Sequence, residues 1–404
     1  MGFSCIGSFA YMPFKKKILY CLFSGFIFIP VAFSQYKFEK PVVIGSELGF
    51  RFNNIRSVIK GNDGFMWLGT SEGLCRFDGQ QVKTIKLTDN FNNAPFTNSV
   101  FAVLPVESEI WAGTSQGLSV MNSRDYTFRH YQFTENGKSD SLKRSIDQQV
   151  SVLHCDRFGT LWVGTRRGIC MYDEAKDNFQ FFSHSKKEFP PLFPSLGSDI
   201  AILSIESSKT NDSVIWAGTA AGLQEINQYS GRVRLYTFPQ QNKDYQVALN
   251  AFRRLYHHDD GLLYVGSWAA GVNVFNPVKA TFTPLEVKSE NGKRIFSKPI
   301  EGICRKNDHE IWITSVAGLA IYDLKLKDIV WHKFNNSVEN EFYAVDYIDE
   351  ANRVWHADIN GLQYFDPVMQ QFSRYSFKHL SGPEWGFVFY ILSDTPGNKI
   401  TVCP

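Results

Sequence analysis

Cysteine is scarce in this chain, and its scarcity limits what the protein can be. Seven cysteines occur among 404 residues, and two of them lie in the first 21 residues. The other five are Cys75, Cys155, Cys170, Cys304 and Cys403. An odd number without a Cys-x-x-Cys pair argues against a zinc site and against a dense disulfide framework. We expect buried free thiols, with one strand separating Cys155 from Cys170 and keeping them too far apart to bridge.

The chain also lacks an excess of charge of either sign. Its 42 basic and 40 acidic residues leave a formal net charge of +2. No Lys/Arg run occurs beyond the N-terminus, so electrostatic attraction to nucleic acid is not indicated. A neutral or locally charged partner is expected instead.

Motifs of the common hydrolases and metalloenzymes are missing. The nine histidines show no His-Glu-x-x-His or other metal-ligand spacing, and no Gly-x-Ser-x-Gly elbow occurs. His257-His258 precedes Asp259-Asp260, and we interpret these four as exposed turn residues rather than a metal site. The sequence therefore predicts no metal, no cofactor and no catalytic residue.

Long apolar runs are absent except near the N-terminus. Lys15 to Lys17 precede an apolar run from Ile18 to Ile29, and Ala32-Phe33-Ser34 follows. This order is that of a secretory signal peptide, predicted over residues 1–34 with cleavage after Ser34. The apolar run is too short to span a bilayer comfortably. The mature chain is therefore expected to be exported to the periplasm.

Aromatic residues and glycine, by contrast, are plentiful. Aromatics make up 15% of the chain, and the 30 glycines are spread along it rather than gathered in a linker. This composition favours many short strands joined by turns.

An internal repeat is the dominant signal. Its first copy reads Asp63-Gly64-Phe65-Met66-Trp67-Leu68-Gly69-Thr70 and continues through Gly73-Leu74 to Phe77-Asp78. Seven copies share an aromatic anchor, at Trp67, Trp111, Trp162, Trp216, Tyr264, Trp312 and Trp355. The sixth copy has Thr314-Ser315 where earlier copies have Gly-Thr, and the seventh has Ala357-Asp358, which we interpret as decay of the motif.

The period of about 48 residues fits four short strands and their turns, the size of one propeller blade. The glycine six residues after the anchor, one residue later in the fifth copy, suits a turn that needs a positive φ. The anchors are expected to pack between blades, because a residue required in every copy is required by the architecture. The predicted fold is all-β: a seven-bladed β-propeller of four-stranded antiparallel blades over residues 35–380, with the start of a further blade at the C-terminus.

The repeat resembles the two-component regulator propeller, most clearly over Gly64 to Gly79, and the resemblance extends over roughly Val42 to Phe377. It is typical of periplasmic sensor regions in hybrid two-component systems of Bacteroidetes, where a membrane helix, a histidine kinase and a DNA-binding module follow. The resemblance implies that the chain senses an oligosaccharide released from a complex polysaccharide, and that the intact sensor is a homodimer. This sequence contains no kinase, membrane helix or DNA-binding module. We therefore expect that it has no enzymatic activity. We also expect it to contact the membrane only through a missing C-terminal segment.

Residues 381–404 look like a truncated repeat. Trp385 to Leu392 is predicted as a first strand and Asp394 to Gly397 as the turn after it. Two arrangements are open: a second propeller begins here, which we favour, or the same ring has an eighth blade.

Two sets of turn residues are candidates for ligand binding. Polar residues precede the first strand of each copy: Asn53, Asn98, Gln148, Ser198, Asn250, Lys298 and Asn340. Their amides either satisfy turn backbone groups or form a ring of donors and acceptors for a hydroxyl-rich ligand.

The turns after the anchor differ from copy to copy, as specificity requires. Arg166 and Arg167, with Arg253 or Arg254, could hold a carboxylate or sulfate, and Trp268 could stack on a sugar ring. Glu301 is an acid in a first strand, but a glycosidase or lyase would need a second, placed acid. A propeller enzyme and a protein-interaction scaffold remain the alternatives to a sensor.

Overall fold

The computed structural model describes the strands and most of the turns between them. The described residues are 42–43, 55–78, 81–87, 98–133, 148–166, 168–182, 201–238, 250–285, 299–315, 318–333, 345–348, 354–358, 361–366, 369–375, 390–393 and 400–403. By its contacts the chain divides into Met1–Phe38 and Glu39–Pro404, and every described residue belongs to the second unit. The predicted signal peptide lies outside the described residues. No helix in the described ranges is long and apolar enough to cross a membrane.

The described part of residues 39–404 is all-β apart from one short 3₁₀ helix, η2 (Glu174–Lys176). Seven of its sheets have four antiparallel strands in chain order. The first three are β2 (Ile55–Lys60), β3 (Met66–Thr70), β4 (Gly73–Phe77) and β5 (Val82–Ile85); β6 (Val100–Val106), β7 (Glu109–Thr114), β8 (Gly117–Asn122) and β9 (Phe128–Tyr131); and β10 (Val150–Cys155), β11 (Leu161–Thr165), β12 (Gly168–Asp173) and β13 (Asn178–Phe182). The next two are β14 (Ile202–Ser207), β15 (Val214–Thr219), β16 (Leu223–Asn227) and β17 (Val233–Tyr236); and β18 (Phe252–His257), β19 (Leu263–Ser267), β20 (Val272–Asn276) and β21 (Thr281–Pro284). The last two are β22 (Ile300–Arg305), β23 (Glu310–Ser315), β24 (Gly318–Asp323) and β25 (Ile329–Lys333); and β26 (Val345–Ile348), β27 (Val354–Asp358), β28 (Gly361–Asp366) and β29 (Gln371–Tyr375).

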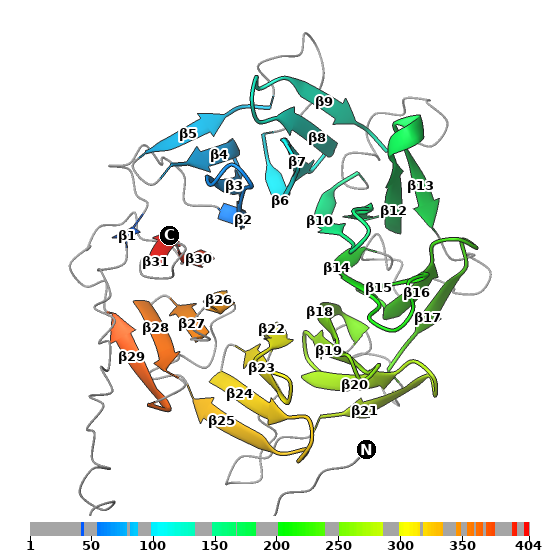
Figure 1. The fold of residues 1–404 in the computed structure, drawn as a ribbon, viewed down its shortest axis with the longest axis vertical. Coiled ribbons are helices and arrows are strands. Elements are labelled where there is room, and N and C mark those ends of the chain that lie inside the picture. The colour runs from blue at the N-terminus through cyan, green and yellow to red at the C-terminus, as the bar shows by residue number, and fades with distance from the viewer. Residues whose placement is uncertain are drawn as a thin grey trace, which may run out of the picture. The chain divides into compact units, whose positions relative to one another are not determined.

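The sheets follow one another around a common centre, with the first strand of each sheet nearest that centre (Figure 1). We call these first strands the inner strands. Each inner strand contacts the next, from β2 to β6 and onward to β26. Four-stranded antiparallel sheets arranged in this way are consistent with propeller blades.

The threonine and glycine of the repeat build the turn between the second and third strands. Thr70 Oγ1 donates to the Gly73 carbonyl at 2.8 Å and accepts from the Glu72 N–H at 3.1 Å. Gly73 has a φ of +141°, where an L side chain is strained, and a Cβ there would lie 2.5 Å from the Ile85 carbonyl oxygen. The prediction of a positive-φ glycine at this turn is therefore confirmed.

The aromatic anchor of each sheet packs against the sheet that follows it. Trp67 is fully buried against Val100, Val103 and Ile110 of the second sheet. The same holds for the described anchors of the other sheets: Trp111, Trp162, Trp216, Tyr264 and Trp312. Removing this apolar surface from water is the main force that holds neighbouring sheets together. The side chain of Trp355 lies outside the described residues.

The four described cysteines whose side chains are placed, Cys75, Cys155, Cys170 and Cys304, are all free. Val163 of β11 pairs with Leu153 of β10 on one side and with Cys170 of β12 on the other. One strand thus separates Cys155 from Cys170, as predicted.

An eighth sheet has three strands and joins the two ends of residues 39–404. β30 (Tyr390–Ser393) pairs antiparallel with β31 (Ile400–Cys403), and β31 pairs parallel with β1 (Val42–Val43). β30 contacts β26 of the seventh sheet and β2 of the first. The predicted strand between Trp385 and Leu392 is present in part, and its position matches the alternative in which the last strands add to the same ring.

Candidate functional site

Every inner strand from the first sheet to the sixth carries a β-bulge at its second residue. The register of each strand shifts by one residue there, as between Ile55 and Ser57 in β2 and between Phe252 and Arg254 in β18. The six bulged residues are Arg56, Phe101, Ser151, Leu203, Arg253 and Glu301. All six are half-buried. A bulge leaves a residue out of the hydrogen-bonded ladder and re-aims its side chain. Because every bulge is at the second residue of an inner strand, the six side chains lie at the same height along these strands. We call this height the level of the bulges.

Arg253 and Trp268 form the most developed contact at this level. The Arg253 guanidinium lies 4.6 Å from the centre of the Trp268 ring, within the range of a cation–π interaction. Trp268 follows β19, and Arg253 belongs to β18 of the same sheet. Trp268 is nevertheless 38% exposed. The turn therefore presents an exposed aromatic ring that an arginine holds in place.

Glu301 of the next sheet anchors this arginine. Arg253 Nη1 donates to Glu301 Oε1 at 3.2 Å, and the Glu301 side chain is only 8% exposed. Burial lowers the pKa of Arg253, and the Glu301 carboxylate opposes that shift. The ion pair thus offsets part of the cost of desolvating the Arg253 charge.

Arg254 joins the two sheets instead of presenting a free guanidinium. Its Nε donates to the Glu301 carbonyl at 2.6 Å, and its Nη2 lies 3.8 Å from Glu301 Oε2. Ser204 holds the same position in β14 and donates from Oγ to the Phe252 carbonyl at 3.1 Å. The structure therefore brings together three predicted site residues, Arg253, Arg254 and Trp268, around Glu301, which the sequence analysis considered only as an unpartnered acid.

The predicted amide positions that the structure describes contact backbone groups. Asn98 Oδ1 accepts from the Leu87 N–H at 2.9 Å, and Asn250 Oδ1 accepts from the Phe238 N–H at 2.6 Å. Each bond ties the end of an outer strand to the start of the next inner strand. Gln148 is buried. These contacts correspond to the first of the two interpretations given above, in which the amides satisfy turn backbone.

Of the other predicted positions, the structure describes Arg166. Arg166 is exposed, and its backbone N–H donates to the Gln149 carbonyl at 3.1 Å. The remaining candidates, Asn53, Arg167, Ser198, Lys298 and Asn340, lie outside the described residues.

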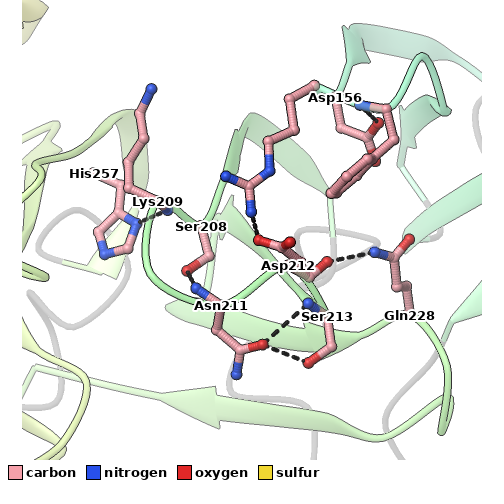
Figure 2. Close-up of polar contacts among 10 residues, drawn as sticks. Asp156, Ser208, Lys209, Asn211, Asp212, Ser213, Gln228 and His257 are labelled. Atoms are coloured by element: carbon pink, nitrogen blue, oxygen red, sulfur yellow. Dashed lines mark hydrogen bonds and ion pairs between the residues drawn. The ribbon is translucent and has the colours of Figure 1, made fainter.

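A second polar network surrounds the turn between β14 and β15 (Figure 2). Asp212 forms an ion pair with Arg157 of the third sheet, and its carbonyl accepts from Gln228 Nε2 at 2.6 Å. On the other side, His257 Nδ1 of the fifth sheet accepts from the Lys209 N–H at 2.6 Å. This turn thus connects three consecutive sheets.

The prediction that His257 and His258 are exposed is wrong. His257 has no exposed surface and His258 is buried as well, because both rings cap backbone N–H groups: His258 Nδ1 accepts from the Asp260 N–H at 3.2 Å. No group of three or more potential metal ligands occurs in the described ranges.

Comparison with known proteins agrees with the repeat. Residues 49–72 match the two component regulator propeller family. The match includes the first part of the first copy, with its anchor Trp67, and it confirms the resemblance inferred from the sequence. No curated protein matches the chain.

One of the solved structures similar to this chain supports the fold. The extracellular domain of BT3049 from B. thetaiotaomicron, titled a hybrid two component system, aligns with a TM-score of 0.53 and 21% identity over 88% of this chain and 50% of its own. Two structures of the extracellular domain of BT4673 from the same organism, one titled a one component and the other a hybrid two component system, align with TM-scores of 0.42 and 0.36. Their identities are 14% and 16%, over 89% and 86% of this chain and 56% and 52% of theirs. The chain therefore spans about half the length of each of these domains.

Proposed function

We propose that this chain is the ligand-sensing part of a two-component signalling system and that it acts in the periplasm. The regulator propeller repeat at residues 49–72 and the fold shared with an extracellular sensor-system domain support this proposal. We further propose that the seven four-stranded sheets are blades of one propeller, which the eighth sheet completes. We also propose that the sensor acts as a homodimer.

We propose an oligosaccharide as the ligand, with Trp268 as the surface on which it stacks. One observation carries this proposal: an exposed indole ring is fixed by Arg253, which is fixed in turn by the buried Glu301. A ring that is already immobilised loses little conformational entropy when a flat apolar sugar face packs on it. Amphipathic aromatic rings at such sites are frequent binding hot spots.

Isothermal titration calorimetry of the mature chain against plant and host oligosaccharides tests the proposal. Wild type is expected to bind at least one oligosaccharide, and Trp268→Ala is expected to weaken that binding about tenfold, or roughly 1.4 kcal/mol. Tyr229→Ala is the matched control, because Tyr229 is an aromatic residue with 77% exposure on another turn.

Three results would count against the proposal. Equal affinity of wild type and Trp268→Ala would remove Trp268 from the site. Release of shortened sugars during incubation would support the glycosidase or lyase alternative. Absence of any sugar binding, together with a protein partner recovered from periplasm, would support the scaffold.

A further inference from the structure

The charges on the inner strands are unbalanced at the level of the bulges. Of the six bulged residues, two are arginines and one is an acid, Glu301. Glu301 faces both Arg253 and Arg254. The guanidiniums of Arg253 and Arg254 therefore share the Glu301 carboxylate, which lies in the sixth sheet, beside the fifth.

Arg56 of the first sheet has different surroundings from Arg253. Its Nη1 donates to Ser99 Oγ at 2.6 Å, and its guanidinium lies 4.1 Å from the centre of the Phe101 ring. In the described part of the chain no carboxylate pairs with it. Burial lowers the pKa of Arg56, which is what a partly desolvated guanidinium without a counter-charge should show.

The geometry leaves Arg56 prepared for an anion. Ser99 and Phe101, both from the second sheet, fix the guanidinium by a hydrogen bond and by stacking, and only one of its N–H groups is used in these contacts. A planar guanidinium can hold a carboxylate or sulfate through two parallel hydrogen bonds. A partly buried charge without a partner is costly, and an anionic ligand would remove that cost.

Arg56 lies at the same level as the proposed sugar platform. The residue before the bulge has an equivalent partner in the two sheets. Ile55, which precedes Arg56, pairs with Thr70, and Phe252, which precedes Arg253, pairs with Ser267. β2 and β18 lie on opposite sides of the ring centre in Figure 1. One extended ligand bound over the centre could therefore approach both.

We propose that Arg56, held by Ser99 and Phe101, is an anion subsite that makes the ligand an acidic oligosaccharide, bearing carboxylate or sulfate groups. This inference rests on the proposed function and deepens it. It differs from the sequence-based prediction, which assigned the anion to Arg166 and Arg167 with Arg253 or Arg254, because Glu301 already neutralises part of the Arg253 and Arg254 charge.

Calorimetry with paired ligands tests the subsite. One pair is a trigalacturonate and its carboxyl-reduced form, and the other is a sulfated galactose oligosaccharide and its desulfated form. Wild type is expected to bind the charged member of at least one pair at least tenfold more tightly, and to lose that preference as salt is raised. The pair that shows the preference identifies carboxylate or sulfate as the group bound.

Variants of Arg56 test whether this residue causes the preference for the charged ligand. Arg56→Gln is expected to abolish it and leave binding of the neutral member unchanged, whereas Arg56→Lys should retain part of it because the charge remains without the planar fork. Arg129→Gln is the matched control, since Arg129 is half-exposed on the outer strand β9 and paired with Glu109. The melting temperature of Arg56→Gln should equal or exceed that of wild type, because an uncompensated charge has been removed.

The outcomes separate this inference from the proposed function. Equal binding of charged and neutral sugars, with loss of both in Trp268→Ala, would leave the sensor proposal standing and overturn the anion subsite. A charge preference that persists in Arg56→Gln would also overturn it. No binding of any member by wild type would overturn the anion subsite, whereas the sensor proposal is overturned only if the wider panel of plant and host oligosaccharides also fails to bind.

Discussion

Gly302 and Thr314 face each other across β22 and β23, and they reverse an arrangement found in the five preceding sheets. In those five sheets the residue of the pair that lies on the second strand is glycine. The pairs are Ser57–Gly69, Ala102–Gly113, Val152–Gly164, Ser204–Gly218 and Arg254–Gly266. In the sixth sheet the glycine is on the inner strand, and a Cβ on Gly302 would lie 2.7 Å from Thr314 Oγ1. One member of the pair is therefore glycine in all six sheets.

This exchange predicts strong coupling between the two positions. Gly302→Ala should destabilise the protein by about 1–3 kcal/mol through overpacking. Adding Thr314→Gly should restore part of that loss, because the double variant reproduces the usual order of the pair. A double-mutant cycle of denaturant unfolding measures the coupling. Simply additive effects would show that the two residues are independent.

Asp156 is expected to stabilise the third sheet through its indole contact. Its Oδ2 accepts from Trp162 Nε1 at 3.2 Å, and its Oδ1 accepts from the backbone N–H groups of Phe158 and Thr160, both at 2.9 Å. Asp156→Ala should cost roughly 2 kcal/mol, since buried donors lose their acceptor. Asp63→Ala in the first sheet should cost less, because its contacts with Phe65 and Trp67 are more exposed. Thermal unfolding compares the two, and a larger loss in Asp63→Ala would contradict this explanation.

The hydroxyl of Thr219 should contribute more to the stability of the protein than its methyl group. Thr219 Oγ1 donates to the Gly222 carbonyl at 2.9 Å and accepts from the N–H groups of Ala221 and Gly222, both at 3.0 Å. Thr219→Val keeps the shape and removes these bonds, so we expect a loss of about 1–2 kcal/mol. Thr219→Ser should remain close to wild type, because the fifth sheet uses Ser267 at this position. Equal melting temperatures for the Val and Ser variants would show that the hydroxyl is dispensable.

Glu206 should make stability fall as pH rises. Burial raises the pKa of this carboxyl from 4.5 to about 7, against smaller opposing effects of Lys209 and the His257 backbone N–H. Between these two values the folded state binds more protons than the unfolded state, so the free energy of unfolding decreases with pH in that window. At 1.36 kcal/mol per pKa unit the loss is at most about 3 kcal/mol.

Glu206→Gln isolates this effect. The variant stays neutral, so it should gain stability over wild type at pH 8 and differ little at pH 4.5. Burial lowers the pKa values of the nearby His154 and His257, and their opposite contribution is common to both proteins and cancels in the comparison. Melting temperatures across this range give the result, and a constant difference between the two proteins would argue against a raised pKa.

The repeat predicts much of this fold because the same residues perform the same task in each copy. The anchor and the glycine of the turn recur at nearly constant spacing, and the first four copies also share the turn threonine, so the four strands and their order follow. The bulges left no such signal, because no residue type is common to all six positions: Arg56, Phe101, Ser151, Leu203, Arg253 and Glu301.

The candidate site was only partly predictable for the same reason. Trp268 stood out because the turns differ between copies, but its support by Arg253 and Glu301 depends on two sheets packing side by side. Thr314 looked like decay of the motif because its partner, Gly302, belongs to a different strand. Contacts between distant residues of this kind become visible only once the sheets are placed next to each other.

The parallel pairing of β1 with β31 has a consequence for the order of assembly. Each four-stranded sheet pairs strands that are close in sequence, so it can form as soon as its own segment is available. Val42, however, pairs with Thr401, and loop closure over such a separation is entropically slow. The first strand must therefore stay unpaired until β31 is available, and during that interval its open edge can pair with other strands.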